Sequence, residues 1–225
     1  MDHPPAEPGS GAVDLYWLPL GAGPGGGLVR ASGRVFEAVA ARRGHREPLD
    51  LFHSALEVEV DGVRHTVEMA PVWAQGGGNH GAVVVGPVGA RPLGRWRWFR
   101  YEVRRWHDGV IPDLAAAVAS PRRVSSDRAR ALQVLALVPL VPALTWGRDE
   151  LRAGEMWNSN SLVSWLLARS GHDLARIGPP PHGRAPGWTA GLVAAQSPGL
   201  PGSRAEGPGG GATFGPAGSG PSAAT

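Results

Sequence analysis

The sequence predicts an α+β domain, in which an antiparallel sheet around a hairpin at residues 51–70 packs on a C-terminal helix. Two strand-like segments, Leu51–Val60 and Val63–Ala70, are joined by Asp61-Gly62, a pair typical of two-residue hairpin turns. Strand patterns fill most of the first half of the chain and helix patterns the second. This order favours α+β over an alternating α/β fold.

Composition allows one domain with tails. The chain has 225 residues, is 42% hydrophobic and contains nine tryptophans, which is enough for a core. It also has 34 glycines and 22 prolines, so part of it is expected to be unstructured. Residues 1–11 and 196–225 have little to bury, and we expect disordered tails there. The folded domain is then 12–195.

Charge and cysteine content exclude several classes of function. The net charge is only +3, which is weak evidence for nucleic-acid binding. The absence of cysteine excludes disulfides, thiolate zinc sites, iron–sulfur clusters and a cysteine nucleophile. The histidines show no paired metal spacing, so neither a metal nor a cofactor is expected. The start lacks a signal peptide and the most apolar stretch, 131–146, contains two prolines, so we expect a cytoplasmic protein without a membrane span.

The first predicted elements are a strand and a helix. Val13–Leu18 reads as a strand, and Ser32 is expected to cap a helix over Arg34–Arg43. Between them, Gly21–Gly26 formally matches G-x-G-x-x-G. A dinucleotide site needs the helix to open at the last glycine, whereas we expect this one to begin near Ser32. A flexible loop is the preferred interpretation.

Further elements follow the hairpin. Strands are expected at Ala82–Val88 and Arg95–Val103, and a helix at Ser126–Val138 with Leu132, Leu135 and Val138 on one side. A last helix, Ser159–Ser170, is expected to stop at Gly171.

The hairpin register predicts which side chains share a face. If Asp61-Gly62 is the turn, the numbers of opposite residues sum to 123. His53 then faces Ala70, Ala55 faces Glu68 and Val58 faces His65. Glu68 therefore shares a face with His53 as its diagonal neighbour, and His65 lies on the other face.

The last helix opens with Asn158-Ser159-Asn160-Ser161, which alone is typical of ordinary N-capping. Ser159 lies at helical spacing with Leu162, Val163 and Leu166. Its hydroxyl is therefore expected to point along the buried stripe, beside the partial positive charge of the helix N-terminus.

A strand histidine in His53-Ser54-Ala55-Leu56-Glu57-Val58, followed about a hundred residues later by Asn158-Ser159 and the apolar pair Leu162-Val163, resembles the circularly permuted papain-like superfamily. The similarity is to its lecithin:retinol acyltransferase-like and PPPDE peptidase branches, and it covers roughly residues 12–172. In those families an Asn-Cys pair opens the helix. Here Ser159 stands in the cysteine position.

The resemblance implies an acyl hydrolase or acyltransferase site. Ser159 would attack a carbonyl, His53 would act as general base and Glu68 would orient it, while Asn158 and Asn160 would position the site or hold the oxyanion. A serine hydroxyl does not ionise beside histidine as a thiol does. A non-catalytic binding module for a small molecule or peptide therefore stays open beside the enzyme.

Residues 91–106 interleave six arginines with five aromatic residues. Such a strand could bind single-stranded nucleic acid by stacking and phosphate contacts. Arginine stems lying over aromatic rings give the same pattern. The modest net charge favours the second interpretation and leaves nucleic-acid binding as the alternative function.

Overall fold

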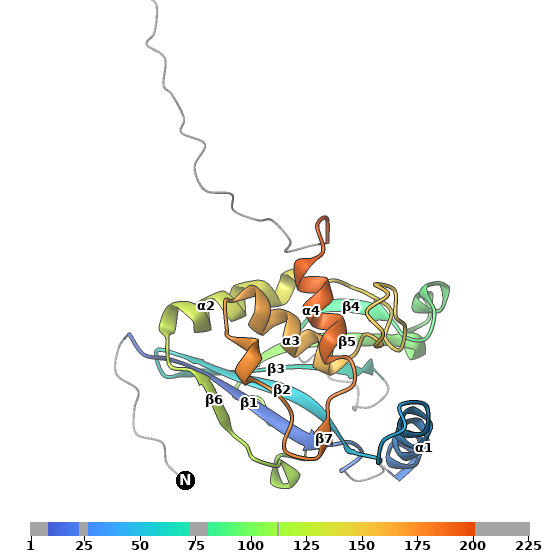
Figure 1. Cartoon of the computed structure of the whole chain (residues 1–225). Coiled ribbons are helices and arrows are strands. Elements are labelled where there is room, and N and C mark those ends of the chain that lie inside the picture. The colour runs from blue at the N-terminus through green and yellow to red at the C-terminus, as the bar shows by residue number, and fades with distance from the viewer. Residues whose placement is uncertain (1–8, 23–26, 73–80, 112, 201–225) are drawn as a thin grey trace, which may run out of the picture.

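The computed structural model of the chain describes residues 9–22, 27–72, 81–111 and 113–200, and shows an α+β fold (Figure 1). Within these residues a sheet of seven strands has the order β4-β5-β3-β2-β1-β6, and β7 pairs with β2 outside this path. All ladders are antiparallel except that of β2 with β7. The strands are β1 Gly11–Pro19, β2 Asp50–Val60, β3 Val63–Pro71, β4 Ala82–Pro87, β5 Arg100–His107, β6 Arg122–Ser125 and β7 Gly183–Arg184.

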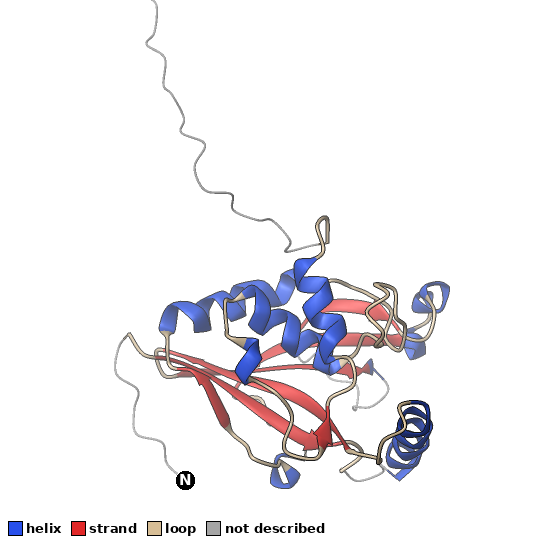
Figure 2. Cartoon of the chain, in the orientation of Figure 1, coloured by secondary structure: helices blue, strands red, loops and turns tan. Residues whose placement is uncertain are grey.

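Three helices cover one face of this sheet, as Figure 2 shows. They are α2 Arg128–Leu137, α3 Ser159–Arg169 and α4 Trp188–Gln196. The remaining helix, α1 Gly27–Arg43, lies at one end of the sheet (Figure 1). No helix in the part of the chain that the structure describes is long and apolar enough to cross a membrane.

The main core lies between the sheet and these three helices. Trp17, Trp157 and Trp165 are almost completely buried in it, together with Leu56 and Leu166. Each fully buried side chain of this size contributes about 2–3 kcal/mol. A second, smaller cluster lies on the other face of the sheet and consists of Tyr16, Leu18, Ala55 and Ile111.

The hairpin register is confirmed over most of its length. The ladder pairs Val58 with His65, as the sum of 123 requires, but it ends at Leu56 and Val67. The pairs expected further along, Ala55 with Glu68 and His53 with Ala70, are therefore wrong. At this end β2 loses β3 as its neighbour, and β7 pairs with Asp50 and Leu51 instead.

Several element boundaries differ from the expectation. Ser32 does not cap α1 but lies inside it, because α1 already begins at Gly27. The objection that this helix begins well after the glycine-rich loop is therefore wrong. The antiparallel pairing of β1 with β2 still differs from the parallel βαβ unit of dinucleotide sites. Residues 23–26 of the loop lie outside the described residues.

Two more expectations need correction in the second half. β5 begins at Arg100 and not at Arg95, because residues 91–95 and 97–99 form two 3₁₀ turns. Leu132 of α2 is exposed, whereas Leu135 is buried, and so is Val138, which begins the 3₁₀ turn after α2. Gly171 ends α3 with a φ of 75°, as expected. The expected tails fall mainly on 1–8 and 201–225, outside the described residues, and β1 begins at Gly11.

Candidate functional site

The N-terminus of α3 is closed by a capping box. The Asn158 side chain accepts hydrogen bonds from the backbone N–H groups of Asn160 and Ser161, and the Asn158 N–H donates to Ser161 Oγ at 3.1 Å. These bonds satisfy the donors that a helix start leaves free. The N–H groups of Asn160 and Ser161 are therefore already occupied and are not free to hold an oxyanion beside Ser159.

Asn160 joins α3 to the sheet. Its amide nitrogen donates to the carbonyl oxygens of Phe52 and Pro186, each at 2.9 Å, and its amide oxygen accepts from Ser54 Oγ at 2.8 Å. Only 3% of Asn160 is exposed. Because both N–H groups and the oxygen have partners, this side chain positions the helix and is not free to bind an oxyanion.

Other polar residues of the same motif hold the segment 186–188. Ser161 Oγ donates to the Gly187 carbonyl at 2.7 Å, and Ser164 Oγ donates to the Trp188 carbonyl at 2.8 Å. Asn158 Nδ2 donates to the Pro186 carbonyl at 2.9 Å. The motif therefore fixes the start of α4 against α3, which explains most of its polar residues without catalysis.

Ser159 differs from its neighbours in the motif. It is the first residue of α3 and only 7% of it is exposed, yet its hydroxyl has no hydrogen-bond partner among the described residues. Its oxygen is not among the fully buried polar atoms that lack a partner, so solvent can satisfy this hydroxyl.

His53 belongs to the face of β2 that points away from α3. It is paired with Leu18 of the smaller cluster, whereas the preceding and following residues, Phe52 and Ser54, both contact Asn160. No hydrogen bond joins His53 to Ser159. Burial lowers the pKa of His53 to about 4, and the Asp113 carboxylate opposes this shift. The imidazole is therefore neutral at pH 7 and a weak base.

Glu68 does not orient His53. It lies opposite Arg104 in the β3–β5 ladder, and both residues are buried. No hydrogen bond joins its carboxylate to His53, and the acidic residue whose charge acts on this imidazole is Asp113. The structure thus gathers Ser159, Asn158 and Asn160 at the start of α3, but it does not assemble a Ser159–His53–Glu68 hydrogen-bonded set.

A cavity of about 860 Å³ lies at the same end of the sheet. It is lined by the end of β1, α1, the start of β2 and the segments 116–118 and 180–181. Its apolar lining includes Leu20, Leu49, Leu51, Phe52, Val118 and Pro180. Phe52 connects this cavity to the start of α3, because its carbonyl accepts from Asn160. Sequence reasoning missed the cavity, since its walls come from five separate segments.

The carboxylate of Glu37 is a buried charge in the wall of the cavity. Burial opposes the ionisation of Glu37, but hydrogen bonds from Arg46 and from the Leu49 N–H outweigh it and lower the pKa of the carboxylate. Arg184 adds a second ion pair at 3.4 Å. Two further lining residues, Arg34 and Asp50, have no ion pair among the described residues.

The histidines and acids of the described residues form no group of three or more that could hold a metal ion. The closest pair is His65 and His107, whose ring centroids are 4.2 Å apart across β3 and β5. A comparison of the chain with protein-family models, with curated proteins and with solved structures finds no match.

Proposed function

We propose that the chain is a non-catalytic, permuted papain-like binding module that holds a small apolar molecule or peptide side chain in the cavity beside Phe52. The cavity carries this proposal. Its volume of about 860 Å³ lies in the range of small-molecule sites, and an apolar lining with a few polar groups is typical of them.

The permuted papain-like ancestry is supported by the order of the elements. A strand that contains His53 precedes a helix that begins at Ser159, and the two contact each other through Ser54 and Asn160. The cavity lies at the end of the sheet where this helix begins, the end at which the resemblance would locate a substrate.

Three observations favour binding over hydrolysis. Ser159 has no base within hydrogen-bond distance among the described residues, the N–H groups of Asn160 and Ser161 are already bonded, and the pKa of His53 is low. An alkoxide has to be generated by a positioned base and stabilised by free donors. Among the described residues no such base contacts Ser159, and two of the nearby backbone donors are already occupied.

The charges at the cavity define the ligand further. The body of the ligand should be apolar, to match the aliphatic and aromatic walls. An ionised end group could pair with Arg34, whose guanidinium has no ion-pair partner among the described residues. A medium-chain carboxylate has both properties.

Binding of a fluorescent carboxylate, dansyl-undecanoic acid, tests the proposal. Ala38 lines the cavity from α1, so Ala38→Trp should fill it and weaken binding by tenfold or more, about 1.4 kcal/mol. Val35→Trp is the matched control, because Val35 lies on the same helix, is 66% exposed and is not part of the lining. Equal affinity of wild type and Ala38→Trp would contradict the proposal.

A further inference from the structure

Five consecutive residues, 95–99, form an exposed tip between β4 and β5, which we call the aromatic tip. Trp98 is 73% exposed, Trp96 46% and Phe99 43%. Arg95 and Arg97 alternate with these rings and are exposed as well. Three aromatic side chains in four positions are a large apolar group for a surface, and such groups mark sites of interaction.

The tip has a defined conformation. The Arg100 guanidinium donates to the carbonyl oxygens of Gly94 at 2.5 Å and Arg95 at 3.0 Å, which fixes the end of the first turn. A backbone hydrogen bond closes each 3₁₀ turn: the Trp96 N–H donates to the Leu93 carbonyl, and the Arg100 N–H donates to the Arg97 carbonyl. These hydrogen bonds therefore fix the backbone that carries the exposed aromatic side chains.

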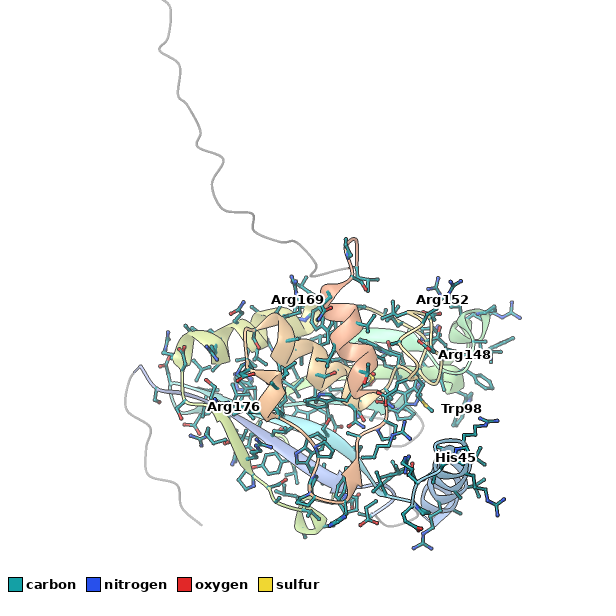
Figure 3. All side chains as sticks on the ribbon, in the orientation of Figure 1. His45, Trp98, Arg148, Arg152, Arg169 and Arg176 are labelled. Carbon is teal, nitrogen blue, oxygen red and sulfur yellow. The ribbon has the colours of Figure 1, made fainter. Side chains whose placement is uncertain are left out.

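Two arginines of another segment lie on the same side of the molecule as Trp98. Arg148 and Arg152 lie along the same edge as Trp98 in Figure 3. Within the described part of the chain neither of them, nor Arg95 or Arg97, forms an ion pair with a carboxylate. This side of the molecule thus combines exposed aromatic rings with four arginines that have no ion-pair partner among the described residues.

We infer that the aromatic tip docks the protein on a membrane surface that carries anionic lipids. Tryptophan rings are favoured at the level of the lipid headgroups, because they are apolar with one polar N–H. Arginines near the surface are attracted by anionic headgroups, while their stems lie along apolar surface. Trp98 and Phe99 enter the interface, and Arg95, Arg97, Arg148 and Arg152 contact the headgroups.

The ring geometry favours lipid over single-stranded nucleic acid. One face of Trp96 is occupied by the Arg95 guanidinium, 3.9 Å from the ring centroid, and Phe99 lies edge-on to Trp96 at 6.4 Å. Successive bases need successive open ring faces on which to stack. The contacts of Trp96 interrupt such a series of open faces, whereas insertion into a membrane interface requires only exposed rings.

Co-sedimentation with phosphatidylcholine vesicles, with and without phosphatidylserine, tests the inference on the full chain. We expect binding to the phosphatidylserine vesicles that decreases with salt. Trp98→Ala, and separately the double variant Arg95→Ala/Arg97→Ala, should each weaken it roughly tenfold or more. Matched controls are Leu140→Ala, which removes an exposed apolar side chain elsewhere, and Arg130→Ala/Arg176→Ala, which removes the same charge from other faces.

Binding that is lost in the tip variants and kept in the controls supports the inference. Absence of binding to phosphatidylserine vesicles overturns it, as does binding that the tip variants leave unchanged. A parallel titration with a single-stranded oligothymidylate tests single-stranded nucleic acid as the alternative partner. If the tip variants weaken oligonucleotide binding while the vesicles stay unbound, the tip is a nucleic-acid site and the inference is wrong.

Discussion

The hydroxyl of Ser54 donates a 2.8 Å hydrogen bond to the amide oxygen of Asn160, across 106 positions of sequence. This buried bond lies where β3 has left the edge of β2. Asn160 also donates to the Phe52 carbonyl. At this end of β2, where the ladder with β3 has ended, a side chain of α3 therefore provides the hydrogen bonds in place of a neighbouring strand. The start of α3 and the wall of the cavity are therefore one structural unit.

Asn160→Ala should be strongly destabilising. The substitution leaves the hydroxyl of Ser54 and the carbonyl oxygens of Phe52 and Pro186 without their partner, and each unsatisfied buried group costs about 1–3 kcal/mol. We expect a loss of about 2–4 kcal/mol in the free energy of unfolding, measured by urea denaturation. Gln133→Ala, on the exposed face of α2, should stay within about 0.5 kcal/mol.

Ser159→Ala and Ser161→Ala should differ in their effect on stability, because only the hydroxyl of Ser161 is hydrogen-bonded within the part of the protein that the structure describes. Ser159 Oγ has no hydrogen bond to lose, so its replacement should change stability by less than about 0.5 kcal/mol. Ser161 Oγ bonds the Gly187 carbonyl and the Asn158 N–H, and its removal should cost about 1–2 kcal/mol. Equal costs in denaturation curves would show that Ser159 has a structural partner.

Gly191→Ala should push α3 and α4 apart. A Cβ at position 191 would lie 2.0 Å from Ser164 Oγ and 2.2 Å from the Ser161 carbonyl oxygen. Overpacking of this kind costs about 1–3 kcal/mol, which calorimetric unfolding would detect as a lower melting temperature. Gly178→Ala is the control, because nothing lies within 4 Å of the added methyl group.

Stability should fall in mild acid because of buried histidines. Burial lowers the pKa of His53 to about 4, so between pH 6.5 and 4 the unfolded chain binds a proton that the folded protein excludes. The stabilisation is complete above pH 6.5 and is lost as the pH falls toward 4, by up to about 3 kcal/mol. His65 and His172, whose pKa values burial also lowers, add to the same trend.

His53→Leu isolates this contribution, because leucine is similar in size and cannot titrate. Urea midpoints measured from pH 7.5 to pH 4 should decline less steeply for His53→Leu than for the wild type. Parallel decline of the two proteins would mean that His53 is protonated freely in the folded state.

Labelling with a fluorophosphonate tests the alternative that the protein is a hydrolase with Ser159 as its nucleophile. The unactivated hydroxyl of Ser159 should not react, and the wild type and Ser159→Ala should give the same signal. The exposed Ser126→Ala serves as a control for background labelling. A signal that disappears only in Ser159→Ala would establish a reactive serine and revive the hydrolase.

Local patterns predicted much of the fold. Alternation and the Asp61-Gly62 turn located β2 and β3, and polar capping residues located the start of α3. α4 was not predicted, because its buried residues are mainly alanines and Gly191, which give a weak periodic signal. β5 was misplaced because arginine–aromatic alternation persists through the 3₁₀ turns that precede it.

The site was harder to predict because it depends on where strands separate. Register arithmetic assumes that a ladder continues, whereas β2 and β3 part after Leu56 and Val67. This separation removes the expected pairing of Ala55 with Glu68 and gives Asn160 its place at the edge of β2. Alternation along β2 correctly implies that Ser54, and not His53, contacts α3, but the histidine was the more conspicuous residue.

The most direct test of the central claim is a crystal structure of the protein soaked with 12-bromododecanoate, recorded with anomalous scattering from bromine. The proposal predicts a bromine peak inside the cavity between Phe52 and Ala38, with the carboxylate toward Arg34. A peak only at other positions, or an empty cavity at saturating ligand, would contradict the binding function.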